Sequence, residues 1–169
     1  MSRYVNNLNK IRQGACEAWL TPCQRLAYNL LRERLQFLDA VNLWGEHGSG
    51  KTFIGWVLNK EEPVAYVPRL DDIPQAVNGT QQDTIIVDNL SWRRTHVREA
   101  LYRCHSYGYR RIVLITNEPV MEQIATVEVR ILGEDLADAA ANLRSIFVAP
   151  TSDTSGKLWS LVSTMRLPS

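Results

Sequence analysis

The residues best suited to do chemistry form a glycine-rich run in the first third of the chain. Its members are Gly45, Glu46, His47, Gly48, Ser49, Gly50, Lys51 and Thr52, followed by Phe53. The first eight match the pattern G-x-x-x-x-G-K-[ST] at every fixed position. Glycines let the backbone curl so that successive N–H groups point at phosphate oxygens, and a following helix adds its positive end. The run therefore predicts a phosphate-binding loop, or P-loop.

Two side chains of this run have predicted roles of their own. Lys51 is expected to reach the β- and γ-phosphates of a nucleoside triphosphate, and the Thr52 hydroxyl to help hold Mg²⁺. A glycine turn can match the pattern by chance. Here a short apolar strand precedes the run and an apolar helix follows it, which is the context in which the pattern binds phosphate.

A second candidate follows the apolar stretch at residues 84–87, which leads into Asp88 and Asn89. Open α/β sheets bind ligands at the carboxyl ends of their strands, so this aspartate is expected at the ligand-binding edge. Taken alone, an aspartate at a strand end is a common turn residue. Because a triphosphate needs its cation held from the protein side, the upstream P-loop favours a metal-binding role for Asp88, directly or through water.

A third candidate is Asn117, which follows an apolar strand expected at residues 111–115. Its amide could contact a γ-phosphate or orient an attacking water molecule. It could equally cap a helix expected near residues 119–125. Both interpretations remain open at this stage.

The elements that must position these residues follow from the hydrophobic pattern. Thr21, Pro22 and Gln24 form a helix start signal ahead of leucines at helical spacing. Beyond them, strands expected at residues 40–44, 63–67, 84–87, 111–115 and 127–132 alternate with helices expected at 51–59, 72–77, 91–106, 119–125 and 135–143. This alternation predicts the α/β class, with a mostly parallel sheet covered by helices on both faces.

The two ends of the chain give weaker patterns. Residues 1–20 are expected to form an arm or a short helix, and residues 21–169 a single domain. Near the C-terminus, a strand is expected at residues 146–149, and a turn-rich segment separates it from an alternating run at 157–166. These two segments predict a C-terminal β-hairpin added to the sheet.

The P-loop, Asp88 and Asn117 at three strand ends, preceded by a helix, resemble the AAA+ and related additional-strand (ASCE) P-loop ATPases. The resemblance covers about residues 20 to 132, and the segment leading through residues 41–45 is similar to helicase-loader and replication-initiator ATPases. It implies a three-layer α/β/α P-loop NTPase core with ATP and Mg²⁺ as ligands and a role in DNA replication initiation. It also implies that Lys51 and Thr52 bind nucleotide and metal, that Asp88 is the Walker B aspartate, and that Asn117 is sensor 1.

The sequence departs from that family pattern in two places. The position after the Walker B aspartate usually holds an acid, but here it holds Asn89, whose amide cannot act as a general base. Hydrolysis is therefore expected to be slow unless Glu46 or Glu118 substitutes. The C-terminal segment also looks too short and too strand-like for the helical lid of most AAA+ proteins, so no sensor 2 arginine is assigned.

The most basic part of the chain spans residues 92–111. Its arginines are interleaved with aromatic residues and include Arg93, Arg94, Arg98, Arg110 and Arg111. They could bind DNA phosphates while the aromatics stack on bases, or supply an arginine finger to a neighbouring subunit. They could equally coat the solvent-facing side of a helix.

The composition sets limits on these alternatives. Of the 169 residues, 45% are hydrophobic and 22% charged, with Lys+Arg at 19 and Asp+Glu at 18. This is typical of a globular domain. No apolar stretch approaches the roughly 20 residues of a membrane helix, no signal core is visible, and the three cysteines lack zinc or redox spacing. A cytoplasmic protein without a membrane partner is expected.

Three functions fit these observations. The first is an ATP-dependent switch or weak Mg²⁺-dependent ATPase that controls assembly as a homo-oligomer, with a protein partner or with DNA. The second is a small-molecule P-loop kinase, although no arginine-rich lid lies between Asn117 and Gly133. The third is a module that holds ATP without hydrolysing it, which Asn89 would suit. A GTPase fits worse, since Glu118 follows Asn117 where the guanine-reading motif needs lysine.

Overall fold

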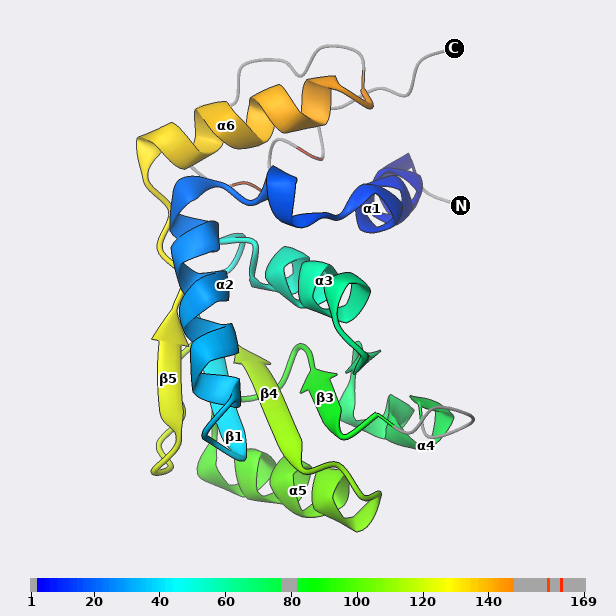
Figure 1. Cartoon of the computed structure of the whole chain (residues 1–169), viewed down its shortest axis with the longest axis vertical. Coiled ribbons are helices and arrows are strands. Elements are labelled where there is room, and N and C mark those ends of the chain that lie inside the picture. The colour runs from blue at the N-terminus through cyan, green and yellow to red at the C-terminus, as the bar shows by residue number, and fades with distance from the viewer. Residues whose placement is uncertain (1–2, 77–81, 148–157, 159–161, 163–169) are drawn as a thin grey trace.

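The computed structural model describes residues 3–76, 82–147, 158 and 162, and within them the chain forms an α/β fold around one parallel sheet (Figure 1). Its strands are β1 (Ala40–Trp44), β2 (Val64–Val67), β3 (Thr84–Val87), β4 (Arg111–Thr116) and β5 (Ala125–Glu128). The strand order is β2-β3-β4-β1-β5, and every pairing is parallel. The strand that enters the P-loop and the strand that ends before Asp88 therefore lie on either side of β4.

Helices cover both faces of this sheet, as the alternating pattern predicts. They are α1 (Arg3–Gly14), α2 (Pro22–Leu35), α3 (Lys51–Glu61), α4 (Ile73–Ala76), α5 (Arg94–Ser106) and α6 (Gly133–Arg144), with 3₁₀ turns at Glu17–Trp19 and Leu70–Asp72. Figure 1 shows α2 and α3 on one side of the sheet and α5 on the other. None of the described helices has the length and apolar character that a bilayer crossing requires.

The two hydrophobic cores arise because successive strand residues point to opposite faces. Ile86 and Val113 pack with α2 and α3, while their neighbours Ile85 and Ile112 pack with Val97 and other residues of α5. All four residues of β3 are buried. Strands covered on both faces become continuous apolar runs rather than alternating ones, and this is why they stand out in the sequence.

Helix α2 begins as its capping signal predicts. Pro22 occupies the first turn, and the Thr21 N–H donates a hydrogen bond of 3.2 Å to Gln24 Oε1. The five expected strands of the sheet and the helices expected at residues 51–59, 91–106 and 135–143 are present, with ends shifted by a few residues. In the N-terminal segment, the expected short helix is α1.

The helix expected at residues 119–125 is wrong. Residues 121–123 form bends, and β5 begins at Ala125. The Val120 N–H donates to the buried side chain of Asn42, and the Glu122 carboxylate is held by Arg94 and Arg98 at 2.6 and 2.7 Å. These tertiary contacts hold the segment in a bent, non-helical path.

Only part of the β-hairpin predicted near the C-terminus falls within the described residues. Ile146 and Phe147 lie in the turn after α6 rather than in a strand, and the remainder of the strand expected at 146–149 lies outside the described residues. The hairpin run at 157–166 also lies outside them, apart from Leu158 and Val162, which are helical. These two residues belong to a third apolar cluster with Ile11 of α1 and Leu143 of α6.

Helix α6 is fastened to the start of α2 by a buried carboxylate. Asp135 accepts the N–H of Cys23 at 3.0 Å and the N–H of Leu132 at 2.7 Å. Burial alone would raise the pKa of Asp135, but these hydrogen bonds outweigh it and the pKa is lowered. The aspartate thus remains charged at neutral pH and holds α6 beside the P-loop side of the molecule.

Strand β1 carries a fully buried asparagine, Asn42, two residues before the strand ends at the P-loop. Asn42 Nδ2 donates to the Leu114 carbonyl at 2.9 Å and to Thr116 Oγ1 at 2.8 Å, and its Oδ1 accepts the Val120 N–H at 3.2 Å. One side chain therefore joins β1, the end of β4 and the segment that follows it.

We predict that Asn42→Ala lowers the free energy of unfolding by about 2–4 kcal/mol, because three buried hydrogen bonds are lost. Asn29→Ala is the matched control, since Asn29 is exposed on α2 and should change stability by less than about 0.5 kcal/mol. Urea denaturation of both variants measures the difference. Equal stability of the two variants would contradict the bracing role of Asn42.

Candidate functional site

The predicted P-loop connects the end of β1 to the first residue of α3. Gly48 and Gly50 adopt left-handed backbone conformations, with φ of 88° and 87°. Gly50 also has no room for a side chain, because a Cβ there would lie 2.1 Å from Gln24 Nε2. The loop residues thus need glycine for reasons of both conformation and space.

Lys51 lies inside the curve of this loop. Its side chain is buried, and its ammonium donates to the carbonyls of Gly45 at 2.7 Å and Glu46 at 2.8 Å. Burial lowers the pKa of Lys51, and the nearby Asp88 carboxylate offsets part of that change. The Lys51 ammonium thus lies where the loop amides and the N-terminus of α3 also favour an anion.

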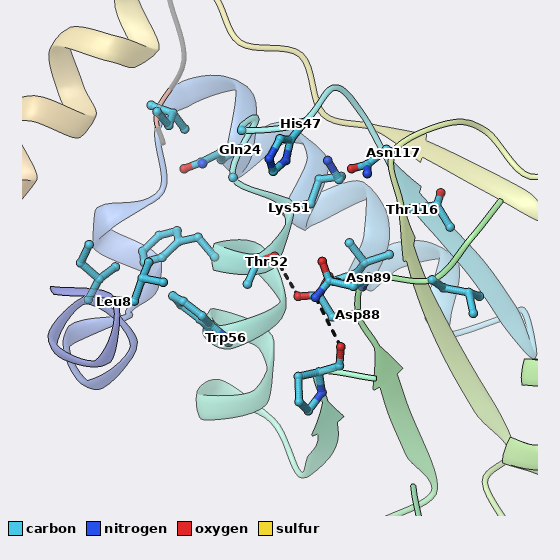
Figure 2. A pocket seen from close by; sticks show the side chains of 18 of the residues that line it. Leu8, Gln24, His47, Lys51, Thr52, Trp56, Asp88, Asn89, Thr116 and Asn117 are labelled. Atoms are coloured by element: carbon cyan, nitrogen blue, oxygen red, sulfur yellow. Dashed lines mark hydrogen bonds between the residues drawn. The ribbon is translucent and has the colours of Figure 1, made fainter. Parts of the chain in front are cut away.

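Asp88 lies next to the P-loop, as its strand-end position predicts. It is 2% exposed, and its Oδ2 accepts the Thr52 hydroxyl at 2.8 Å and the Tyr66 hydroxyl at 2.6 Å. Its Oδ1 accepts the Asn89 N–H at 2.7 Å. Figure 2 shows Thr52 and Asp88 facing each other across the floor of the pocket.

The donor set suits magnesium. A hydroxyl and a carboxylate are the oxygen ligands that this ion accepts, and it usually takes only one or two of them together with phosphate oxygens. The described residues contain no group of three or more His, Cys, Asp or Glu side chains that could hold a metal ion alone. Thr52 and Asp88 thus fit a cation that arrives with a phosphate ligand.

Asn89 has an unusual backbone and an exposed side chain. Its φ is 52°, a left-handed conformation that asparagine tolerates better than most residues. Its amide nitrogen donates to the Pro68 carbonyl at 3.3 Å. The residue therefore presents no proton acceptor of carboxylate strength beside Asp88.

Asn117 lies at the carboxyl end of β4 and its side chain is exposed in the same pocket (Figure 2). The preceding residue, Thr116, is buried and donates to the Glu118 carbonyl at 2.6 Å. Because no helix begins near Pro119, the alternative role of Asn117 as a helix cap is wrong. Its position at the pocket leaves the phosphate-contacting interpretation open.

These residues share one cavity of about 930 Å³. Of the predicted nucleotide-binding residues, six line it: His47, Gly48, Gly50, Lys51, Thr52 and Phe53. Gly45, Glu46 and Ser49 belong to the loop but not to the cavity wall. Asp88 and Asn117 face the polar end, whereas Leu8, Trp56 and Leu143 line an apolar end beneath α1 and α6.

Comparison with known proteins adds to this geometry. No family model and no curated protein matches the sequence. The structure of AMPPCP-bound DnaA from Aquifex aeolicus is similar, with a TM-score of 0.54 and 15% identity over 84% of this chain and 60% of that one. A DNA replication initiation factor gives a TM-score of 0.50 and 15% identity over 70% and 49%. The chain has a P-loop NTPase-like fold.

At this level of identity the likeness shows the fold alone. This chain also spans 60% of the DnaA chain and 49% of the initiation factor. The likeness agrees with the α/β P-loop NTPase fold that the sequence predicts.

The basic stretch does not form one continuous patch. Arg93 lines the cavity mouth, and Arg94 and Arg98 follow it on α5, where both pair with Glu122. Arg110 and Arg111 lie beyond the other end of α5, a helix of 13 residues and about 20 Å, and Arg111 begins β4 at the edge of the sheet away from the P-loop. Only the first group is close to the candidate site.

Sequence reasoning missed two residues that support the site. The sequence predicts only a capping role for Gln24, whereas its Nε2 also donates to the Ser49 carbonyl of the P-loop at 3.5 Å. It predicts only that Tyr66 belongs to a strand, whereas the Tyr66 hydroxyl also donates to Asp88. The signal in the sequence is the hydroxyl-bearing Tyr66, one residue before the end of the apolar strand β2. Its contact with Asp88 cannot be read from the sequence, because that contact depends on β2 lying beside β3.

We predict that Gly50→Ala lowers the free energy of unfolding by about 1–2 kcal/mol or more. Alanine is strained in the left-handed conformation of this residue, and its Cβ would collide with the Gln24 side chain. Gly133→Ala is the control: a Cβ there meets nothing within 4 Å, so stability should be unchanged or slightly higher. Thermal and urea unfolding compare the two variants. A neutral Gly50→Ala would show that the loop geometry does not require glycine.

Proposed function

We propose that the protein binds ATP with Mg²⁺ and acts as an AAA+-like switch or weak ATPase of the additional-strand division. The observation that carries the proposal is the meeting of the buried Lys51 ammonium with the Thr52–Asp88 pair in one cavity. The position of β4 between β1 and β3 supports the additional-strand assignment.

Each residue has a role in this proposal. Lys51 and the loop amides would bind the β- and γ-phosphates, exchanging the loop carbonyls for phosphate oxygens. Thr52 and Asp88 would hold Mg²⁺, which when bound offsets negative charge on the phosphates. Asn117 would contact the γ-phosphate or orient the attacking water from the end of β4.

Slow hydrolysis follows from the groups around Asp88. The Asn89 amide cannot take a proton from water, and it donates instead to the Pro68 carbonyl. Of the two suggested substitutes, Glu118 lines the cavity and Glu46 does not. Glu118 is therefore the better candidate for a weak general base.

The output of the switch is assigned to assembly with a second copy, a protein partner or DNA. Arg93, at the cavity mouth, is the arginine best placed to respond to the bound nucleotide. In this proposal residues 21–169 form one nucleotide-binding domain. Helix α1 precedes that domain and lines part of its cavity through Leu8 and Ile11. A cytoplasmic site of action belongs to the same proposal.

The proposal predicts that Lys51→Ala weakens Mg·ATP binding by about 10- to 100-fold, the effect of losing a charged hydrogen-bonding partner. Calorimetry measures the dissociation constants, with Lys10→Ala as the control because Lys10 is exposed on α1. Unchanged affinity in Lys51→Ala, or no ATP binding by the unaltered protein, would refute the proposal. Transfer of phosphate to an added metabolite, without release of free phosphate, would indicate the kinase alternative.

If the missing acid limits turnover, Asn89→Glu should raise ATP hydrolysis by about 10-fold or more, since a positioned general base contributes roughly 10²–10⁴-fold. Phosphate release at saturating Mg·ATP measures the rate. Asn89→Gln is the control, because it has the same length without a carboxylate. Equal rates in the two variants would show that another step is limiting.

A further inference from the structure

Tyr66 connects the candidate metal-binding carboxylate to a strand that carries no part of the P-loop motif. Its hydroxyl donates to Asp88 Oδ2 at 2.6 Å, and the Thr52 hydroxyl donates to the same oxygen at 2.8 Å. A carboxylate oxygen offers about two acceptor positions, so Oδ2 is fully used. Oδ1 accepts one bond, from the Asn89 N–H, and among the described residues it retains one free position.

Three donors therefore fix the orientation of the Asp88 carboxylate. They are Thr52 of α3, Tyr66 of β2 and the N–H of Asn89, which follows Asp88 in the chain. A carboxylate held in this way has one direction left in which to accept a further hydrogen bond or a cation. Without the Tyr66 hydroxyl, Oδ2 would keep only the Thr52 donor, and two donors instead of three would hold the carboxylate.

Tyr66 is itself held in place. Its ring packs against α3 at Gly55, where a Cβ would lie 3.3 Å from Tyr66 Cε2, and the Arg12 guanidinium lies 5.5 Å from the ring centroid. A tyrosine hydroxyl ordinarily carries its proton at neutral pH, so it can donate to the Asp88 carboxylate. A glycine inside a helix is unfavourable by about 1 kcal/mol, and here it makes room for this ring.

We propose that Tyr66 is a positioning residue for magnesium: it orients Asp88 so that the free position on Oδ1 serves the cation or its bound water. This inference rests on the proposed binding of Mg·ATP and adds a residue outside the P-loop and Walker B segments. Hydrogen-bonded partners of metal-binding carboxylates typically change metal affinity 10- to 100-fold when removed.

The test is Tyr66→Phe in the full chain, which removes one hydroxyl and keeps the ring. Mn²⁺ binding to the protein–ATP complex is measured by electron paramagnetic resonance, and ATP binding without metal is measured in EDTA. Metal affinity should fall by about 10-fold or more. ATP affinity in EDTA should stay within about 2-fold, because Tyr66 does not contact the phosphates in this scheme.

Tyr28→Phe is the matched control. The Tyr28 hydroxyl is fully buried and has no hydrogen-bond partner in the described part of the chain, so its removal should leave both affinities unchanged. An unchanged metal affinity in Tyr66→Phe would overturn the inference. So would an equal loss of ATP affinity in EDTA, which would indicate a general structural role. Absence of ATP binding by the unaltered protein would instead overturn the proposed function.

Discussion

The candidate site depends on the parallel pairing of β4 with both β1 and β3. Trp44 pairs with Thr116 at one boundary, and Val87 pairs with Leu114 at the other. Because all three strands run in the same direction, their carboxyl ends meet at one edge of the sheet. The P-loop, Asp88 and Asn117 are brought together by this register, although each belongs to a different part of the sequence.

The features that the sequence predicts well are those encoded by neighbouring residues. Lys51 and Thr52 have fixed places within the P-loop pattern, and the apolar run before Asp88 is visible because β3 is buried on both faces. The α/β class follows from the same alternation. The P-loop can be predicted from neighbouring residues because it directly connects β1 to α3, so its position in the fold follows from the chain itself.

The features that the sequence did not predict require contacts between distant segments. The roles of Asn42 and Tyr66 depend on strand order, which no local pattern specifies. The helix expected near residues 119–125 is wrong for a related reason: a hydrogen bond to Asn42 and ion pairs with α5 override the local preference. Polar groups buried beside the site were thus the least predictable part of the structure.

Helix α3 links the two ends of the cavity. Its first residues, Lys51 and Thr52, line the polar end, and Phe53 and Trp56 of the same helix pack against the apolar cluster that includes residues of α1 and α6. At its last turn, Lys60 donates to the carbonyls of Gln13, in the last turn of α1, and of Ala15, just after that helix. The contacts that close the apolar end therefore also fix α1, so the shape of the cavity depends on a helix that contains none of the motif residues.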